Sequence, residues 1–499
     1  MPFKRSDIDE LFSLRQELKK NGQITAPVDL LLNSLFTIIS YQFEQLEGLK
    51  EENELLKLEI AKLKSKKKKN SSNSSLPPSQ DSNRKRGCHK NPSKKSAGGQ
   101  PGHKGNTLRK TDKPDAITKH LLRGKCPCGR ALSKSRKKGF EERQVFDIEI
   151  KRKVTSHQGE IGECKCGIIH KAIFPKDVSN HTQYGPIAKT LATYFCQYQL
   201  IPFERTQEIF NDVFNLGLCK ATVFNHIKKG ATGLLSFKDW AVEDLLKSKL
   251  NYADETTTQV QKSRFHLHVV SNNQTTLLDV YKSRGIEAVE AMGVLPTYKG
   301  KLVHDCYAMY FGYPCKDVIC NAHLERELNY FSQREKFEWA AAMELFLKDL
   351  YKSTKALRES GRKKRCSKEY KLIEREFNKI LTQARKECRE IINKKRIKQE
   401  PVVNLFKRMR KHKKGILLFS KDFSVPYTNN QAERDLRMSK VHLKISGCFR
   451  SYEMAKTWSL FRSYISTLKK RQINVIRGLK ILFDPSIKDP IYSILGHPS

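Results

Sequence analysis

The chain has 499 residues and a formal net charge of +42, because 95 Lys and Arg residues outnumber 53 Asp and Glu residues. Such an excess is typical of a protein that binds a polyanion, and the length predicts about three or four domains. A mean hydropathy of −0.61 without a long apolar run excludes a membrane-spanning helix, and scattered cysteines with no apolar signal segment favour the cytoplasm.

Residues 1–64 are expected to form a helical region that dimerises through a coiled coil. Between residues 24 and 64, apolar side chains recur at alternating steps of four and three, which is a heptad pattern. Leu is frequent at d, and Asn53 stands among apolar a positions, as in parallel two-stranded coils. The alternative is one amphipathic helix packed on its own domain. The heptad positions are Leu35, Ile39, Gln42, Leu46, Leu49, Asn53, Leu56, Ile60 and Leu63.

Residues 65–118 are expected to be a basic linker. The stretch from 61 to 110 holds 15 Lys and Arg residues and one acidic residue, Asp81. Low apolar content with high charge does not offset the entropy lost on ordering a chain. The segment is therefore predicted to be a solvated linker or an arm that contacts nucleic acid.

Residues 119–180 are expected to form a zinc-ribbon-like module. Two Cys-x-Cys pairs are each followed by Gly, and four thiolates suit tetrahedral Zn²⁺, although each pair is one residue shorter than Cys-x-x-Cys. Alternating residues 144–150 predict a strand between the pairs. The alternative is four thiols without metal on two tight turns. The expected ligands are Cys126, Cys128, Cys164 and Cys166, with His103, His120 and His170 as possible substitutes.

Residues 181–245 are expected to be helical and to include a helix-turn-helix. Residues 205–214 and 220–229 have helical patterns, with a turn at 215–219. Plain helical packing is the alternative. The residues expected on the exposed face of the second helix are Thr222, Asn225, His226 and Lys229.

Residues 246–333 and 416–470 are expected to form a ribonuclease H-like α/β core. The order of the predicted elements is strand, strand, strand, helix, strand, strand, helix, which is the order of that fold. The predicted strands are 250–254, 264–270, 275–281, 301–305 and 316–320, and the predicted helices are 285–292 and 323–331.

Two further segments complete the predicted multidomain α+β organisation. Residues 334–415 interrupt the core as a basic helical insertion with 27 Lys and Arg against 11 Asp and Glu residues. Its charge clusters favour nucleic-acid binding over a merely solvated hairpin. Residues 471–499 are expected to be a C-terminal tail.

Three carboxylates fall at points where this fold would bring them together. Asp254 is expected to end the first strand, Asp305 the fourth, and Glu433 to lie in the helix after the insertion. Carboxylates bind Mg²⁺ or Mn²⁺, and a third one permits a two-metal site. Strand-end turns and a capping box at Glu433 are the alternatives. Glu255 ranks below these three because neighbouring strand residues point to opposite faces.

Several short motifs are distributed along the chain. They lie at residues 70–79, at the two cysteine pairs, and at residues 253–256, 304–308, 320–323 and 429–434. With these motifs the chain resembles the transposases of the insertion sequence 66 family over nearly its whole length. The resemblance implies a DDE-type transposase whose catalytic triad corresponds to Asp254, Asp305 and Glu433, and it implies small accessory proteins of the same element.

The sequence therefore predicts a bacterial, nucleoid-associated DNA transposase that acts as a homodimer or higher oligomer and contacts no membrane. It would bind terminal inverted repeats and target DNA, and it would cut and join strands with Mg²⁺ or Mn²⁺. The alternatives are a non-catalytic DNA-binding protein derived from a transposase and a structure-specific nuclease. Cys320 and His323 would either bind a metal or pack the helix. Further residues expected to orient DNA are His323, Arg326, Asn430, Arg434 and Lys444.

Overall fold

The computed structural model describes residues 5–68, 107–175, 177–395 and 400–498. The described chain is a mixture of helices and strands that divides into two compact units. One unit comprises residues 1–86 and 321–413, and the other comprises residues 87–320 and 414–499. Residues 70–79, His103 and most of the expected linker lie outside the described residues.

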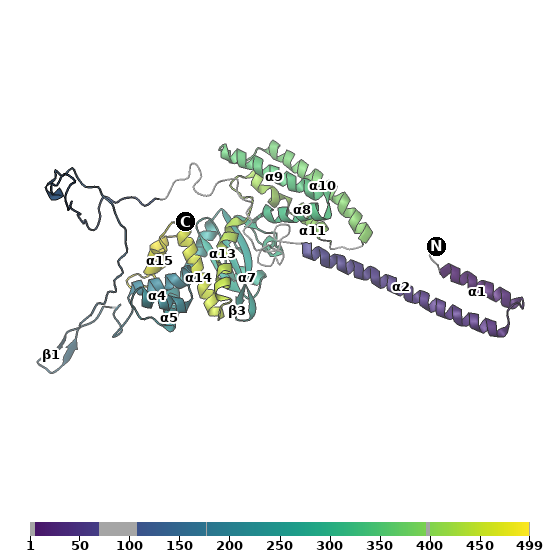
Figure 1. Ribbon diagram of the computed structural model, residues 1–499, viewed down its shortest axis with the longest axis horizontal. Coiled ribbons are helices and arrows are strands. Elements are labelled where there is room, and N and C mark those ends of the chain that lie inside the picture. Colours follow the sequence, from purple (N-terminus) through teal and green to yellow (C-terminus); the bar gives the residue numbers. More distant parts are fainter. Residues whose placement is uncertain (1–4, 69–106, 176, 396–399, 499) are drawn as a thin grey trace. The chain divides into compact units, whose positions relative to one another are not determined.

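A five-stranded sheet forms the centre of the second unit, with the order β5-β4-β3-β6-β7. The first three strands in sequence pair antiparallel as two hairpins, and β6 and β7 join parallel beside β3. The sheet is drawn in teal in Figure 1. The strands are β3 (Leu250–Val260), β4 (Ser263–Ser271), β5 (Thr276–Tyr281), β6 (Lys301–His304) and β7 (Lys316–Ile319).

Strand β3 is longer than the sequence predicts, and Asp254 lies within it rather than at its end. The strand continues to Val260 because β4 pairs with β3 from Tyr252 to Val260. A tight turn joins the two strands, and Gln261 in this turn has a φ of 54°. The parallel partner β6 pairs with β3 only as far as Tyr252. Asp254 therefore still lies just past the point where the neighbouring parallel strand stops.

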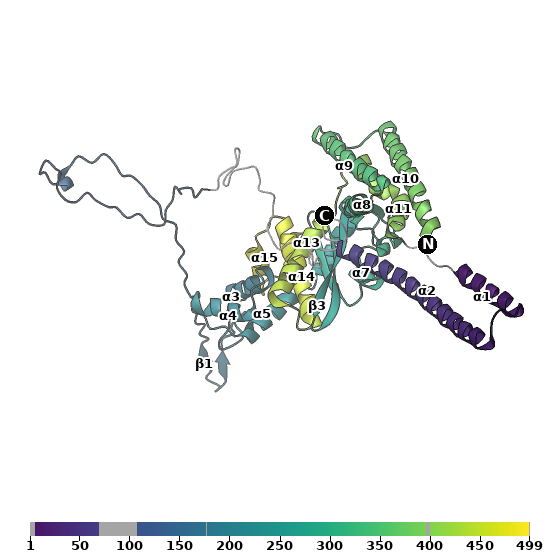
Figure 2. The ribbon, with the colours of Figure 1, turned by 45° about the vertical axis from the view of Figure 1, so that its right-hand side comes forward.

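Helices that precede and follow the strands in the chain bury the apolar side chains of the sheet. Helix α6 (Phe237–Lys247) precedes β3, and α7 (Ile286–Met292), α13 (Asn430–Ser446) and α14 (Tyr452–Lys470) follow the hairpins. Figures 1 and 2 both show α13 and α14 beside the sheet, where α13 contacts β3 and α14 contacts β5.

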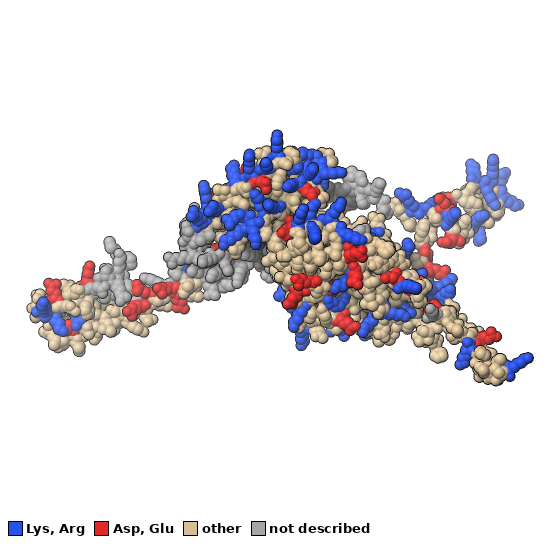
Figure 3. Space-filling view, turned by 180° about the vertical axis from the view of Figure 1, so that it is seen from behind, with Lys and Arg blue, Asp and Glu red and all other residues tan. Residues whose placement is uncertain are grey.

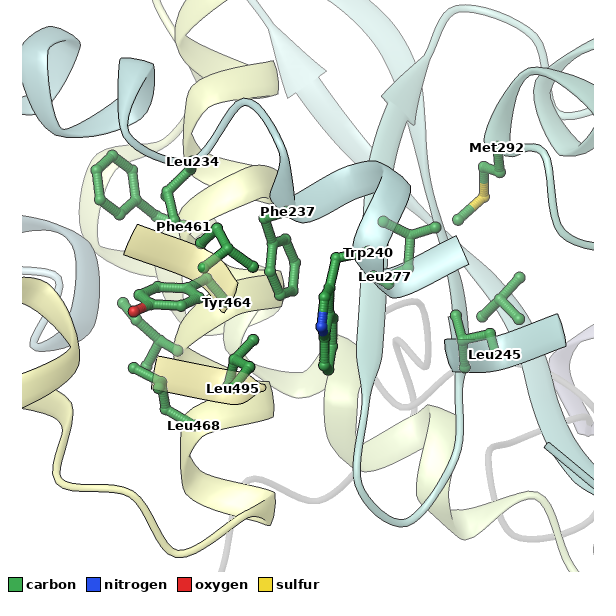
Figure 4. Close-up of a cluster of buried hydrophobic side chains, with 14 of the residues drawn as sticks. Leu234, Phe237, Trp240, Leu245, Leu277, Met292, Phe461, Tyr464, Leu468 and Leu495 are labelled. Carbon is green, nitrogen blue, oxygen red and sulfur yellow. The ribbon is translucent and has the colours of Figure 1, made fainter. Parts of the chain in front are cut away.

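Aromatic side chains fill the core between these helices. Figure 4 shows Phe237 between Trp240 and Tyr464, with ring centroids 6.0 and 5.5 Å apart, respectively. All three are fully buried, as large aromatic groups must be to contribute most of their apolar area. Helix α14 thus contacts both α6, which precedes the sheet, and strand β5 of the sheet.

The C-terminal residues belong to this core. Two short helices, α15 (Val475–Ile481) and α16 (Pro490–Leu495), lie in the segment expected as a tail. Leu479 and Ile491 are fully buried, and the Trp240 indole donates a hydrogen bond to the Gly496 carbonyl across 2.7 Å. Burial of this kind stabilises the core and is not typical of a loose tail.

Three α-helices precede α6 in the second unit. They are α3 (Pro186–Thr193), α4 (Phe203–Asp212) and α5 (Lys220–Thr232), and α5 packs against the other two. The turn between α4 and α5 includes Asn215 with a φ of 46°. These helices have the positions predicted from the sequence for a helix-turn-helix.

Residues 107–175 are mostly extended and exposed. They contain a short helix η1 (Leu132–Lys134) and a hairpin of β1 (Ile161–Glu163) and β2 (Ile169–Lys171). The strand predicted at 144–150 is absent, and Val145 and Ile148 are 93 and 83 % exposed. Alternating apolar residues form a strand only where a partner strand accepts their hydrogen bonds, and here the segment has none.

Helices make up the described part of the first unit. The long helix α2 (Ala26–Lys68) carries the heptad pattern, and α1 (Arg5–Lys20) folds back on it. Arg15 pairs with Asp29 at 2.6 Å, and the rings of Phe12 and Phe36 lie 5.9 Å apart, so the two helices run antiparallel.

The basic insertion is helical, as predicted. Successive helices pack on one another, and blue Lys and Arg side chains crowd their exposed surface in Figure 3. None of the described helices has the length and apolar character needed to cross a bilayer. The helices of the insertion are α9 (Glu338–Glu359), α10 (Ser367–Lys395) and α11 (Pro401–Lys411), with α8 (Asn321–Glu335) before it and α12 (Lys413–Lys421) at its end.

Candidate active site

Three carboxylates meet at one edge of the sheet. Asp254 and Glu255 lie on β3, and Asp305 directly follows the adjacent parallel strand β6. One oxygen of each lies within 4.8 Å of the others, the one such group of metal-ligating side chains among the described residues. Because parallel neighbours end at the same edge, Asp254 and Asp305 are brought together by the strand pairing itself.

The electrostatics of this group suit a divalent cation. Burial, followed by the negative charges of Glu255 and Asp305, raises the pKa of Asp254 well above its usual range. The backbone amide of Glu255 donates to Asp254 Oδ1 across 2.8 Å and opposes this shift. Carboxylates that repel one another in a partly dry site are stabilised as anions by a hard cation, and the donor set therefore fits Mg²⁺ or Mn²⁺.

Asp305 also has the turn role that the sequence left open. Its Oδ1 accepts a hydrogen bond from the Tyr307 backbone amide at 3.0 Å, and the intervening Cys306 has a φ of 65°. The turn fixes the direction of the carboxylate as β6 ends. Turn chemistry and metal binding are therefore compatible at this residue, because one oxygen bonds the backbone and the other stays available.

Glu433 lies near the group but outside its tight cluster. It is the fourth residue of α13, and its charge contributes to the raised pKa of Asp254. The capping box expected with Asn430 at the N-cap and Glu433 at N3 is out of register, because the helix already begins at Asn430 and its N-cap residue, Asn429, makes no side-chain cap. The side-chain amide of Asn429 instead donates a hydrogen bond to the Ala253 carbonyl at 2.8 Å. The beginning of α13 is thereby held against β3, one residue from Asp254.

Glu255 joins the cluster, although strand alternation ranked it below Asp254 as a ligand. Alternation sets the direction of the Cβ atom, but β6 no longer flanks β3 at this point and the longer Glu side chain reaches the open edge. Its Oε1 accepts hydrogen bonds from Arg284 Nε and Nη2 at 2.9 and 2.6 Å. Its Oε2 accepts one from the Tyr310 hydroxyl at 2.6 Å. Burial and the charge of Asp305 raise the pKa of Glu255, and Tyr310 and Arg284 oppose this.

The residues expected on α5 divide into exposed and buried ones. Asn225 and Lys229 are exposed and Thr222 is half-buried, whereas His226 is 8 % exposed and was wrongly placed on the outer face. The His226 ring packs edge-on against Tyr184 at 5.4 Å. Burial lowers the pKa of His226 to about 4, so this side chain is part of the packed face.

The expected DNA-orienting residues of α13 are on the surface. Asn430, Arg434 and Lys444 are all exposed, whereas His323 and Arg326 on α8 are half-buried. Lys440 was not predicted from the sequence, although it follows Glu433 by two helical turns on the same face. It donates to the Thr257 carbonyl at 2.9 Å, and burial lowers its pKa.

Cys320 packs at the end of β7. It is fully buried, and its Sγ accepts a hydrogen bond from the Asn429 backbone amide at 3.2 Å. Packing is therefore the role that the structure supports for Cys320, and a metal role with His323 is not supported.

Each of the two cysteine pairs lies in a tight turn that is closed by a backbone hydrogen bond. The Gly129 amide donates to the Cys126 carbonyl, and the Gly167 amide donates to the Cys164 carbonyl, both at 2.8 Å. Backbone amides lower the thiol pKa of one cysteine in each turn, Cys128 and Cys164, which favours the thiolate form that binds Zn²⁺. The described structure does not bring the two turns together as one cluster of ligands.

Comparison with protein families identifies the part of the chain that contains this site. The profile of the transposase IS66 family matches residues 182–457, more than half of the chain and all four carboxylates. A family of unknown function, DUF6444, matches residues 5–109. No curated protein matches the chain.

Proposed function

The chain belongs to the IS66 transposase family, and from this premise we propose that it cuts and joins DNA at the ends of a mobile element. It would bind terminal inverted repeats and then target DNA. Strand cleavage and strand transfer would occur at the carboxylate cluster, with Mg²⁺ or Mn²⁺ as the cofactor. Related roles, such as DNA binding without catalysis or structure-specific cleavage without joining, are outcomes of the test below.

The meeting of Asp254 and Asp305 at one edge of the sheet, in a cluster with Glu255, is the observation that carries this proposal. The strand order β5-β4-β3-β6-β7, with three antiparallel strands followed by two parallel ones, supports a ribonuclease H-like core. In such a core, adjacent parallel strands present their acidic residues at one edge. The same edge receives the start of α13, because Asn429 bonds to the residue before Asp254.

The residues of the site have separate tasks in the proposed reaction. Asp254, Asp305 and Glu433 would hold two divalent ions, which when bound activate the attacking oxygen and stabilise the leaving oxygen. Asp254 and Asp305 are fixed by the paired strands and by the Asp305 turn. Glu433 comes from a helix, and its approach to the other two depends on the position of α13.

Positive charge elsewhere on the chain supports DNA as the substrate. The excess of 42 positive charges favours binding to phosphates with little sequence preference. Asn225 and Lys229 on α5 are exposed, as a helix that enters the major groove requires. Arg434 and Lys444 are exposed on the helix that carries Glu433. We propose that α5 contributes to end recognition and α13 to strand positioning.

Two further parts of the proposal concern assembly and metal. The seam of α2 leaves Leu35 and Leu49 45 and 59 % exposed, which supports a homodimer or higher oligomer through a coiled coil. Cysteines at 126, 128, 164 and 166 would bind one structural Zn²⁺ and hold residues 119–180 as a DNA-binding module. Accessory proteins of the element and a place at the bacterial nucleoid also belong to this proposal.

The test is a strand-cleavage assay with purified protein, DNA that carries the element's ends, and Mg²⁺. We expect wild-type protein to release 3′-hydroxyl ends and to join them to a target duplex. Asp254→Asn and Asp305→Asn should abolish both steps while they retain DNA binding and a cooperative melt. If wild-type protein binds the ends but leaves them intact, it is a DNA-binding protein without catalytic activity. Cleavage without joining would show a nuclease.

A further inference from the structure

Glu255 has both carboxylate oxygens engaged although it lies in the acidic cluster. Oε1 accepts two hydrogen bonds from Arg284, and Oε2 accepts one from Tyr310. The Glu255 side chain is 2 % exposed. A carboxylate that would bind a metal must expose an oxygen toward it, and this carboxylate is directed instead to a guanidinium and a phenol.

Arg284, unlike Glu255, is partly exposed to solvent. It lies in the loop between β5 and α7, and its side chain is 47 % exposed. The guanidinium lies over the Tyr307 ring, 4.2 Å from the centroid. Glu255 uses two of its five N–H groups. Arg284 is therefore anchored at one edge by a buried anion, stacked on an aromatic ring, and open to solvent at the rim of the carboxylate cluster.

We propose that Arg284 binds a backbone phosphate of the DNA strand next to the bond that is cut, and that Glu255 is a positioning residue that holds Arg284. This inference rests on the proposed function. A planar guanidinium matches two phosphate oxygens, and fixing it beforehand lowers the entropy lost on binding. It also places a cation where the carboxylates would otherwise repel the DNA backbone.

The choice between this role and a metal-ligand role for Glu255 makes the proposal testable. A ligand that is lost raises the Mg²⁺ concentration needed for half-maximal cleavage. A phosphate contact that is lost raises the KM for DNA and lowers the salt dependence of binding by about 0.9 in log K per log salt. The two readouts are independent, because salt dependence is measured without cleavage.

The experiment uses the full chain with Arg284→Ala, Arg284→Lys, Glu255→Gln and the double variant, and with Lys282→Ala as a matched control. Lys282 is an exposed cation two residues from Arg284 in the same loop. We expect Arg284→Ala to raise KM about tenfold or more and to lower the salt slope by about 0.9, as for one lost phosphate contact. Arg284→Lys should retain part of the affinity, because the Lys ammonium keeps the positive charge but lacks the planar pair of donors of the guanidinium.

Glu255→Gln should raise KM without changing the Mg²⁺ requirement, and the double variant should be no worse than Arg284→Ala alone. A higher Mg²⁺ requirement in Glu255→Gln would overturn the proposal by making Glu255 a ligand. Equal effects of Lys282→Ala and Arg284→Ala, or an unchanged salt slope in Arg284→Ala, would also overturn it. If wild-type protein binds ends but does not cut, the proposed function fails, whereas the salt slopes still decide the role of Arg284.

Discussion

The side-chain amide of Asn429 donates a hydrogen bond to the backbone carbonyl of Ala253 across 2.8 Å. Asn429 is fully buried, and its backbone amide donates to Cys320 Sγ at the end of β7. Ala253 precedes Asp254, and Asn429 precedes the helix that carries Glu433. One side chain therefore joins the segments that hold two of the three proposed metal ligands.

Asn429→Ala should weaken both the fold and the site. Removal of a buried hydrogen-bonding group typically costs about 1–3 kcal/mol of unfolding free energy. Because the start of α13 would then be less firmly held to β3, the Mg²⁺ concentration for half-maximal cleavage should also rise. Denaturant unfolding and a Mg²⁺ titration of cleavage measure the two effects.

The control for this variant is Asn430→Ala. Asn430 is the next residue and is exposed, so its removal should change the unfolding free energy by less than about 0.5 kcal/mol. Equal destabilisation by both substitutions would contradict a tether at Asn429.

The five strands and the two antiparallel hairpins were predictable because each strand has a local pattern and short gaps impose hairpins. The proximity of Asp254 and Asp305 could likewise be predicted, since Asp254 lies on β3 and Asp305 follows its parallel neighbour β6. The extension of β3 to Val260 depends on its pairing with β4, which no local pattern shows. At residues 144–150 the alternating pattern wrongly predicted a strand, because alternating apolar residues form no strand without a neighbouring strand to pair with.

The details of the site depended on contacts between distant residues. Glu255 is bound by Arg284 and Tyr310, which follow it by 29 and 55 residues. The pattern of alternation contains no information about such partners. His226 was misplaced because a position between the buried and exposed faces of a helix is decided by the neighbouring helix, here through Tyr184.

Purified protein should contain one zinc ion per chain, bound by the two cysteine turns. Cys164→Ala with Cys166→Ala should remove it, because two thiolates do not complete a tetrahedral site. Elemental analysis of the protein measures the metal content. Cys366→Ala is the matched control, since Cys366 is an exposed thiol in another part of the chain. Zinc that is absent from fresh wild-type protein, or is retained by the double variant, would exclude these ligands.

The full chain should dimerise through α2. Leu49 is an exposed d residue of the heptad pattern, and Leu49→Glu would place two charges in the seam of a parallel coil. We therefore expect a monomer in sedimentation experiments with Leu49→Glu and a dimer or larger species with wild type. Asn53→Leu should raise thermal stability but give mixed oligomers, because an Asn at an a position specifies two strands. Glu51→Lys lies off the seam and should leave the assembly unchanged, so a monomer there would count against this interface.

Acidification should destabilise the second unit through His442. Its ring stacks on Phe449 at 4.3 Å, and burial lowers its pKa from 6.5 to about 4. Between these values the unfolded chain binds a proton that the folded chain does not, so stability falls as the pH falls from 6.5 to about 4. At pH 5 this contribution is about 1–2 kcal/mol. His442→Phe keeps the stacking and should reduce the pH dependence in this window by the contribution of one histidine, as measured by thermal melts at pH 7 and pH 5. A remainder is expected, because burial also lowers the pKa of His226 to about 4. Parallel curves for variant and wild type would show that His442 does not contribute.

Glu433→Gln tests whether Glu433 completes the metal site from outside the tight cluster. The substitution keeps size but removes the negative charge, and loss of a ligand from a two-metal site should lower the cleavage rate by about a hundredfold or more. The protein should stay folded, because a charge change near a helix start costs about 0.3–1 kcal/mol. DNA binding should persist. Glu453→Gln is the matched control, since Glu453 lies in the first turn of α14 and its exposed carboxylate pairs with Lys228. A folded Glu433→Gln variant that cuts at the wild-type rate would remove Glu433 from the site.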